Sequence, residues 1–224
     1  MTDIDGATIL ITGANGGLGA EFVTQALARG ARRVYAAART PREWGDARVV
    51  PLSLDVTDRD AIAQAADAAP DVDIVINNAG ILRRGDLLTG DLADIEAMWE
   101  TNTLGPLLVA RAFAPRLVAA SGALVNIGSV LSWYAAGKGY SMSKAALWSQ
   151  TEGLRLELAP QGVHVMGVYL AYTDTPMNAG MDPAGMNTPA DVVAQVYDGL
   201  VAGAGELLAD DTTRAVRSRL SQVG

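Results

Sequence analysis

Short apolar runs alternate along this chain with longer amphipathic segments. The runs are residues 8–12, 32–38, 48–54, 72–77, 122–128, 163–170 and 206–209. Strands read as continuously apolar when helices cover both faces of their sheet, and alternation with helices indicates parallel strands joined by right-handed crossovers. The pattern therefore predicts one doubly wound α/β domain over residues 1–224, with a mostly parallel sheet of about seven strands and helices on both faces.

The composition excludes several classes of function. A net charge of −8 argues against a nucleic-acid-binding protein, which usually carries a basic surface stripe. The chain has no cysteine and His164 is its one histidine, which excludes thiol catalysis and metal sites built on cysteine or several histidines. We therefore expect neither a nucleic-acid partner nor a bound metal.

The chain is expected to act in the cytoplasm and away from membranes. Its first residues show no charged leader followed by an apolar stretch and a cleavage site. Arg111, Pro115 and Arg116 interrupt the best candidate for a membrane span. The absence of cysteine fits a reducing compartment.

Two helical segments and one loop are expected in the parts that carry no strand signal. The helices cover roughly residues 91–101 and 103–120, and the second contains a proline. Residues 177–191 are rich in Gly, Met, Asn and Pro without a period, which predicts a substrate loop or lid.

A glycine cluster, TGANGGLG, stands between the first strand and its helix at residues 12–19. Gly13, Gly17 and Gly19 carry no Cβ where the chain must turn tightly and a phosphate must approach the backbone. The helix that follows offers free N–H groups and a partial positive charge to a pyrophosphate. The cluster predicts nucleotide binding, although its G-x-x-x-G-x-G spacing differs from the commoner G-x-G-x-x-G.

A second pair of residues, Tyr140 and Lys144 in YSMSK, lies on the helix-like segment that follows the fifth strand. Positions i and i+4 share one face of a helix, so both side chains can point into the same cleft. An ammonium beside a phenol favours the phenolate and should lower the tyrosine pKa from its usual value near 10. The pair then becomes a candidate proton donor and acceptor.

Together these motifs resemble the short-chain dehydrogenase/reductase family. TGxxxGxG, NNAG (residues 77–80) and YxxxK (residues 140–144) occur in the family's order, with further matches at Asp55, Asn102 and Ser129. The resemblance runs from about residue 8 to residue 177. It implies a Rossmann domain that binds a nicotinamide dinucleotide and interconverts carbonyl compounds and alcohols.

The resemblance also implies a role for each catalytic residue. Tyr140 would be the acid/base, and Lys144 would hold the nicotinamide ribose as well. Ser129 would hydrogen-bond the substrate oxygen, and Asn102 would hold a water for a proton relay. The eleven positions from Ser129 to Tyr140 are two fewer than is usual in the family, so Ser132 is kept as a competitor for Ser129.

The cofactor implied by the resemblance is NADP(H) rather than NAD(H). A carboxylate at the end of the second strand would bind the ribose hydroxyls of NAD, whereas Arg39 stands there and can pair with a 2′-phosphate. Asp55 and Val56 look like the adenine-contacting pair, although Asp55 also reads as a helix cap. The full set of implied contacts is Gly13, Asn15, Gly16, Gly17, Leu18, Gly19, Arg39, Asp55, Val56, Asn78, Ala79, Gly80, Tyr140, Lys144, Thr173 and Thr175.

One further segment departs from the family pattern. Leu170 and Ala171 stand where a Pro-Gly pair normally follows the sixth strand. This puts the usual backbone path beside the nicotinamide in doubt. Candidate wall residues for the substrate are Trp133, Tyr134, Met177, Met181 and Met186.

The favoured interpretation is an NADP(H)-dependent oxidoreductase acting on a small-molecule carbonyl or alcohol. A non-catalytic NADP(H)-binding sensor is the alternative, motivated by the shortened serine loop and the altered Pro-Gly pair. An isomerase or dehydratase would need acid/base groups that the sequence does not identify. The resemblance also implies a homodimer or homotetramer that pairs through residues 103–120 and 141–160.

Overall fold

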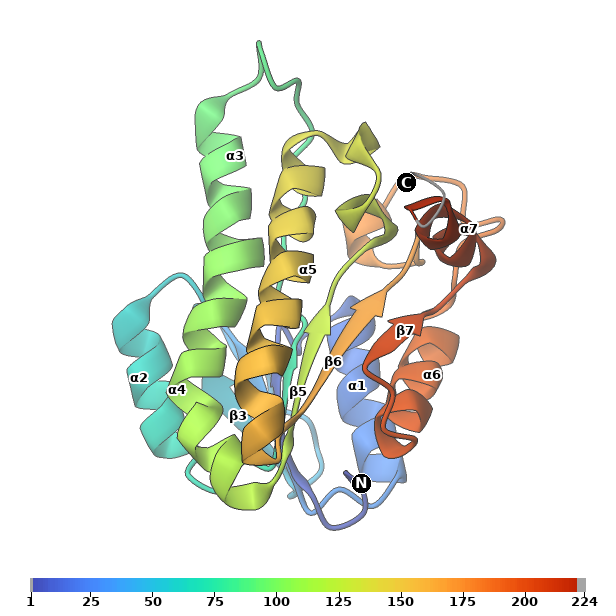
Figure 1. Ribbon diagram of the computed structural model, residues 1–224. Helices are drawn as coiled ribbons and strands as arrows, with labels where there is room; N and C mark the ends of the chain where they lie inside the picture. Colours follow the sequence, from blue (N-terminus) through green and yellow to red (C-terminus); the bar gives the residue numbers. More distant parts are fainter. Residues whose placement is uncertain (1, 221–224) are drawn as a thin grey trace.

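The computed structural model describes residues 2–220, in which strands and helices alternate as the sequence predicts (Figure 1). The strands are β1 (Thr8–Thr12), β2 (Arg33–Ala38), β3 (Val49–Ser53), β4 (Ile74–Asn77), β5 (Ala123–Ile127), β6 (His164–Tyr169) and β7 (Glu206–Leu208). The α-helices are α1 (Gly17–Ala28), α2 (Arg59–Ala68), α3 (Leu92–Trp99), α4 (Gly105–Ala120), α5 (Gly139–Leu158), α6 (Pro189–Val201) and α7 (Asp211–Leu220). Short 3₁₀ segments are η2 (Val130–Ser132), η3 (Ala135–Gly137), η4 (Ala159–Gln161) and η5 (Pro176–Asn178).

All described strands join one seven-stranded sheet in the order β3-β2-β1-β4-β5-β6-β7. Every neighbouring pair is parallel, which confirms the predicted fold class. The strand order reverses between β1 and β4, where Ile11 pairs with Ile76. Ligands of such sheets bind at the carboxyl ends of the strands beside this reversal.

Helices cover both faces of the sheet, as Figure 1 shows. On one face α1 packs against α6 through Phe22 and Tyr197, whose rings meet edge to face at 5.7 Å between centroids. The Tyr197 hydroxyl donates to the Phe22 carbonyl at 2.8 Å. On the other face α2, α4 and α5 cover a cluster that includes Leu10, Val75 and Phe113. Both faces of the strands are therefore shielded from water, which explains their continuous apolar sequence.

The two helices predicted at 91–101 and 103–120 form one continuous helical stretch. A π-helical segment, η1 (Glu100–Leu104), joins α3 to α4 and contains Asn102. Such segments widen one turn and often occur at functional sites. Pro115 lies inside α4 without ending it.

This joined helix is longer than the sequence indicated. Leu92–Ala120 spans 29 residues and is long and apolar enough, by length and composition alone, to cross a membrane. The sequence analysis had expected no such run. Val109, Phe113 and Leu117 are fully buried in the core of the domain, whereas Leu92, Trp99 and Leu104 are exposed.

The predicted loop 177–191 is shorter than expected because α6 begins at Pro189. Thr188 caps this helix by accepting from the Asp191 N–H at 3.1 Å, and proline is favoured at a first helical position. A bridge between Thr173 and Asn187 closes the base of the loop.

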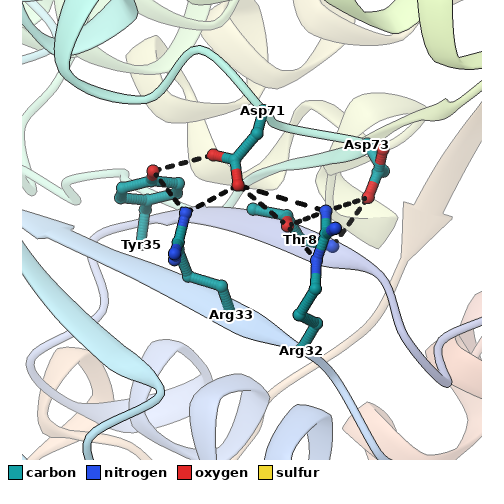
Figure 2. A network of polar contacts seen from close by, with 6 residues as sticks. All are labelled: Thr8, Arg32, Arg33, Tyr35, Asp71 and Asp73. Atoms are coloured by element: carbon teal, nitrogen blue, oxygen red, sulfur yellow. Dashed lines mark hydrogen bonds and ion pairs between the residues drawn. The ribbon is translucent and has the colours of Figure 1, made fainter.

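Polar side chains fix both ends of the central strands. Figure 2 shows the network at the amino ends, formed by Thr8, Arg32, Arg33, Tyr35, Asp71 and Asp73. Asp71 accepts from Arg33 at 2.7 Å and from the Tyr35 hydroxyl at 2.8 Å, while Asp73 accepts from the Thr8 N–H at 2.8 Å. The loop that enters β4 is thereby held against β1 and β2.

A buried chain of amides holds the other end. Asn77 at the end of β4 donates to Asn126 of β5 at 2.9 Å and to the Pro106 carbonyl at 3.2 Å. Asn126 in turn donates to Thr151 of α5 at 2.9 Å. These bonds connect the two strands to the helix that carries Tyr140.

We expect Asn77→Ala to lower the free energy of unfolding by about 2–3 kcal/mol, because the Asn126 and Pro106 oxygens would lose a buried donor. Urea denaturation measures this directly. A loss below about 0.5 kcal/mol would show that the amide chain does not stabilise the strand ends.

Candidate active site

A cavity of about 920 Å³ lies at the carboxyl ends of the strands. Its walls come from the segments that follow β1, β2, β4, β5 and β6, and from α5 and α7. This is the position expected of a ligand site at a strand-order reversal. The cavity therefore defines where the predicted site residues can act together.

The glycine turn after β1 forms one wall of the cavity. Gly13 and Gly17 have left-handed backbones, with φ of +67° and +53°. A Cβ on Gly19 would overlap the carbonyl oxygen of Gly13, so the helix can start here only without a side chain. Gly16 and Leu18 line the same wall.

The start of α1 is suited to an anion. Within residues 2–220, α1 begins without a side-chain cap or an acidic residue in its first turn, whereas Asp58 caps α2. The free N–H groups and the helix dipole of α1 therefore face the cavity mouth without a carboxylate nearby. These features fit the pyrophosphate of a dinucleotide.

Thr12 locks the glycine turn to the segment after β4. Its hydroxyl accepts from the N–H groups of Asn78 and Ala79, both at 3.0 Å. The Asn78 amide donates back to the carbonyls of Thr12 at 2.9 Å and Gly13 at 3.2 Å. The sequence analysis did not single out Thr12, although it opens the glycine motif.

The structure brings Ser129, Tyr140 and Lys144 together, buried at the wall of the cavity. The Ser129 side chain lies close enough to the Tyr140 hydroxyl to favour the ionised phenol and lower its pKa. The Lys144 ammonium lies 5.8 Å from the centre of the Tyr140 ring and donates to the Ile127 carbonyl at 2.8 Å. Ser132 instead donates to the Lys144 carbonyl at 3.0 Å, within the packing of α5.

Burial dominates the ionisation of this pair. It raises the pKa of Tyr140 to about 12, against a smaller lowering by the Ser129 side chain. It also lowers the pKa of Lys144 to about 8. The Tyr140–Lys144 spacing had predicted a lowered tyrosine pKa; that direction is wrong for the folded chain, because burial of the phenol raises its pKa. At neutral pH Tyr140 is therefore a protonated donor.

Asn102 supports the loop after β4 rather than lining the cavity. Its side-chain oxygen accepts from the Ile81 N–H at 2.8 Å, and its amide donates to the Ile81 carbonyl at 2.9 Å. A Cβ on Gly80 would lie 3.2 Å from the Asn102 oxygen and 3.8 Å from the Lys144 nitrogen. Gly80 thus lets these two groups approach each other, while the water relay stays a prediction.

The predicted adenosine contacts divide into two groups. Arg39 lines the cavity with an exposed side chain. Asp55 and Val56 lie outside the lining: Asp55 accepts from the Thr57 N–H at 2.9 Å and from its hydroxyl at 2.8 Å. These Thr57 bonds, with a smaller contribution from the charge of Arg39, hold the Asp55 pKa below its usual range.

The remaining cofactor candidates flank these walls. Asn15 is exposed and donates to the Thr40 carbonyl at 2.7 Å, which ties the glycine turn to the segment after β2. Thr173 and Thr175 both line the cavity, and Thr175 lies beside Gly17. The turn after β1 and the segment after β6 therefore meet across the cleft.

The shortened loop between Ser129 and Tyr140 contains a strained residue. Lys138 has φ +52° and ψ −116°, a backbone conformation that favours glycine. Its side chain forms an ion pair with Asp86 on the loop after β4. Ser141 holds the turn from inside, accepting from the Gly137 N–H at 3.0 Å and donating to the Tyr134 carbonyl at 2.8 Å.

The altered Pro-Gly position also has a structural partner. The Ala171 N–H donates to the Asp210 carboxylate at 2.8 Å, so a residue just before α7 holds the chain after β6. The sequence analysis did not find Asp210, because nothing in its local sequence marks a partner far along the chain.

Only some of the residues predicted for the substrate wall line the cavity. Tyr134 and Met177 line the cavity, whereas Met181 and Met186 lie outside the lining. Trp133 packs inside the protein, with its ring 4.4 Å from that of Tyr169. In the described part of the chain, no group of three or more His, Cys, Asp or Glu side chains could hold a metal.

Comparison with known proteins gives consistent similarities. A family model described as short chain dehydrogenase matches residues 7–184. A short chain dehydrogenase from Burkholderia cenocepacia J2315 in complex with NADP is 36% identical, with a TM-score of 0.93 over 98% of this chain and 95% of that one. A short-chain dehydrogenase from Sphingobium yanoikuyae in complex with NADPH is 28% identical, with a TM-score of 0.82 over 97% and 96%.

A sequence relative agrees with these structures. The short-chain dehydrogenase cctT of Talaromyces islandicus is 35% identical over 192 residues, which is 79% of this chain. The matched region spans 65% of the length of that relative.

We expect Lys138→Gly to be more stable than Lys138→Ala by about 1 kcal/mol, because both variants lose the ion pair but only glycine relieves the backbone strain. Thermal and urea unfolding of the two variants give the difference. Equal stabilities would show that the Lys138 backbone is unstrained.

The buried ammonium gives a pH-dependent prediction. Below about pH 8 the folded and unfolded chains both carry the Lys144 charge, so the folded state bears its full desolvation penalty. Between about 8 and 10.5 the folded chain releases the proton first, and stability rises with pH. We therefore expect Lys144→Met to be more stable than the parent at pH 7, on the order of 2–3 kcal/mol, with the gap narrowing above pH 8.

Unfolding free energies measured from about pH 6 to pH 10 check this sign. A gap that stays constant across that range would contradict the assigned lowering of the lysine pKa.

Proposed function

Because the chain belongs to the short-chain dehydrogenase family of oxidoreductases, we propose that it is an NADP(H)-dependent enzyme that interconverts a carbonyl compound and an alcohol. One observation carries the proposal. Ser129, Tyr140 and Lys144 line the same cavity as the glycine turn and the uncapped start of α1. Proton transfer and dinucleotide binding thus have one common site.

The proposed reaction combines hydride transfer with proton transfer. When bound, the nicotinamide supplies the hydride to the carbonyl carbon or accepts it from the alcohol. In reduction, Ser129 and Tyr140 hydrogen-bond the carbonyl oxygen, and Tyr140 gives it a proton. A phenol held protonated by burial suits this direction, because it is a donor at neutral pH.

Lys144 serves the state that follows proton donation. Its ammonium stabilises the Tyr140 phenolate, because an opposite charge nearby favours the ionised phenol. The bond to Ile127 uses one N–H and orients the others for the ribose hydroxyls of the cofactor. We propose that Asn102, through the π-helical segment, holds the water that returns a proton to this pair.

The glycine turn and Arg39 are proposed to select NADP(H). The pyrophosphate would bind at the start of α1, and Arg39 would pair with the 2′-phosphate. Ala38 ends β2 and Arg39 follows it, without the carboxylate that an NAD enzyme places there. The NADP and NADPH complexes of the two similar structures support this choice.

A homodimer or homotetramer in the cytoplasm is proposed as the working form. Exposed apolar side chains lie on α5 at Met142 and Leu156 and, just before α4, at Leu104 of the π-helical segment. Such residues suit the pairing that the family resemblance implies. The non-catalytic sensor loses its motivation, since Lys138 and Asp210 accommodate the shortened loop and the altered Pro-Gly pair.

Arg39→Asp should reverse the cofactor preference from NADPH towards NADH, because a carboxylate repels the 2′-phosphate and accepts from ribose hydroxyls. The ratio of dissociation constants for the two cofactors, measured by fluorescence titration, gives the result. Arg42→Asp is a matched control, since Arg42 stacks on the Trp44 ring at 4.0 Å and should leave the ratio unchanged. An unchanged ratio in the Arg39 variant would refute its role.

Tyr140→Phe should keep NADPH affinity within about twofold and lower the turnover number by about 10²–10⁴-fold, because the proton donor is removed. The assay follows NADPH absorbance with a panel of ketones and aldehydes. NADPH binding by the parent without turnover on the whole panel would favour the sensor instead.

A further inference from the structure

Helix α7 forms a wall of the cavity that the sequence analysis did not anticipate. Thr212 and Val216, one turn apart on this helix, both line the cavity. Neither belongs to the motifs that suggested the fold or the chemistry. Their position raises the question of which part of a ligand they meet.

Helix α7 lies on the side of the cavity formed by the serine loop. It packs against η2, the segment that directly follows Ser129 (Figure 1). The Arg217 guanidinium lies 5.1 Å from the centre of the Trp133 ring and is 3.2 Å from Glu206 of β7. Thr212 and Val216 therefore face the part of the cavity next to the proton donor.

Asp210 fixes α7 to the other wall. Its carboxylate accepts from the Ala171 N–H at 2.8 Å, from the Asn187 amide at 2.9 Å and from the Thr213 N–H at 2.8 Å. The first two partners belong to the connection between β6 and α6, and the third lies in the first turn of α7. The Asp210 side chain thus holds the start of α7 to the connection between β6 and α6.

The lining at this end is apolar. Its side chains near the serine loop, the β6 loop and α7 include Val130, Leu131, Tyr134, Tyr172, Met177 and Val216. Among the residues described, the cationic lining side chains are Arg39, Arg83 and Lys144, and Arg83 lies 3.6 Å from the Asp94 carboxylate. A substrate carboxylate would find no free cation here beyond the catalytic lysine.

We propose that α7 is the specificity-determining wall of this enzyme and that Val216 contacts the apolar substituent of an uncharged ketone or aldehyde. The inference rests on the proposed function. Reduction of such a ketone consumes NADPH and one proton and yields the secondary alcohol and NADP⁺. Thr212 and Val216 would then limit how bulky the substituent can be.

The test compares Val216→Trp with Ala215→Trp, which places the same side chain at an exposed position of α7 outside the lining. The substrates are acetophenone, the smaller butan-2-one, and phenylglyoxylate, in which a carboxylate replaces the methyl group. The parent should prefer acetophenone to phenylglyoxylate by about tenfold or more in kcat/KM. Val216→Trp should lower kcat/KM for acetophenone by about tenfold or more and for butan-2-one by less than about threefold.

Two controls separate this wall from the cofactor site. NADPH affinity should be the same in the parent and both tryptophan variants, and Ala215→Trp should keep the parent's substrate ratio. Three results would overturn the proposal. They are an equal loss of kcat/KM for both ketones in Val216→Trp, an effect of Ala215→Trp as large as that of Val216→Trp, and a preference of the parent for phenylglyoxylate.

Failure of the proposed function gives a different pattern. If the parent reduces none of the ketones, acetophenone binding to the NADPH-loaded protein is measured by calorimetry. If Val216→Trp abolishes acetophenone binding and Ala215→Trp keeps it, the role of α7 as a wall is supported although the proposed reaction is not. If the parent does not bind acetophenone, the proposed wall and the proposed reaction are both overturned.

Asp210→Asn tests the spacing of the wall independently. The amide keeps the size of the side chain but is a weaker acceptor for the Ala171 and Thr213 N–H groups. We expect the acetophenone to butan-2-one ratio of kcat/KM to change by about threefold or more, a readout that a loss of stability alone would not move. An unchanged ratio would remove Asp210 from the specificity account.

Discussion

Close contact between backbones at the end of β1 is the constraint on which the site depends. Gly19 packs where any side chain would overlap the Gly13 carbonyl, and a Cβ on Gly13 would lie 3.0 Å from the Ala79 Cα atom. Thr12 then joins the two turns by hydrogen bonds that need this approach. Because these glycines have no side chains, the two turns approach closely enough to form the cleft. The same glycines leave the start of α1 accessible to an anion.

Packing also sets the electrostatics of Tyr140 and Lys144. The β5 end and α5 bury Tyr140 and Lys144 together, so desolvation raises the pKa of the phenol and lowers that of the ammonium. Both shifts favour the neutral forms of the two groups, so the phenol keeps its proton at neutral pH and the ammonium loses its proton only above about pH 8. A positively charged nicotinamide would favour the phenolate, which is the form needed to take a proton from an alcohol.

The fold class, and the placement of Tyr140 and Lys144 beside the glycine turn, were predictable from sequence because their signals are local. Continuous apolar runs indicate a sheet that is covered on both faces. The spacing of the glycines indicates a tight turn, and the spacing of Tyr140 and Lys144 indicates one face of a helix. The break expected near residue 102 was wrong, because a π-helical segment continues the chain without one. Asp210 and Val216 were not predicted, because their positions matter only through residues distant in sequence. Asp210 accepts from the Ala171 N–H, and Val216 lines a cavity formed mostly by other segments. The direction of the Tyr140 pKa shift was missed for the same reason: burial is a property of the whole fold.

The central claim is that burial keeps the Tyr140 phenol protonated and that the cofactor's charge makes it titratable. Carbon-13 NMR of the tyrosine Cζ atoms, with Tyr140→Phe for assignment, measures this in the protein alone and with saturating NADP⁺. The account predicts a Tyr140 signal that does not move between about pH 7 and pH 10.5 in the protein alone, as expected for a pKa of about 12, and a midpoint well below pH 10 with NADP⁺. A signal that titrates near pH 10 in both samples would contradict it.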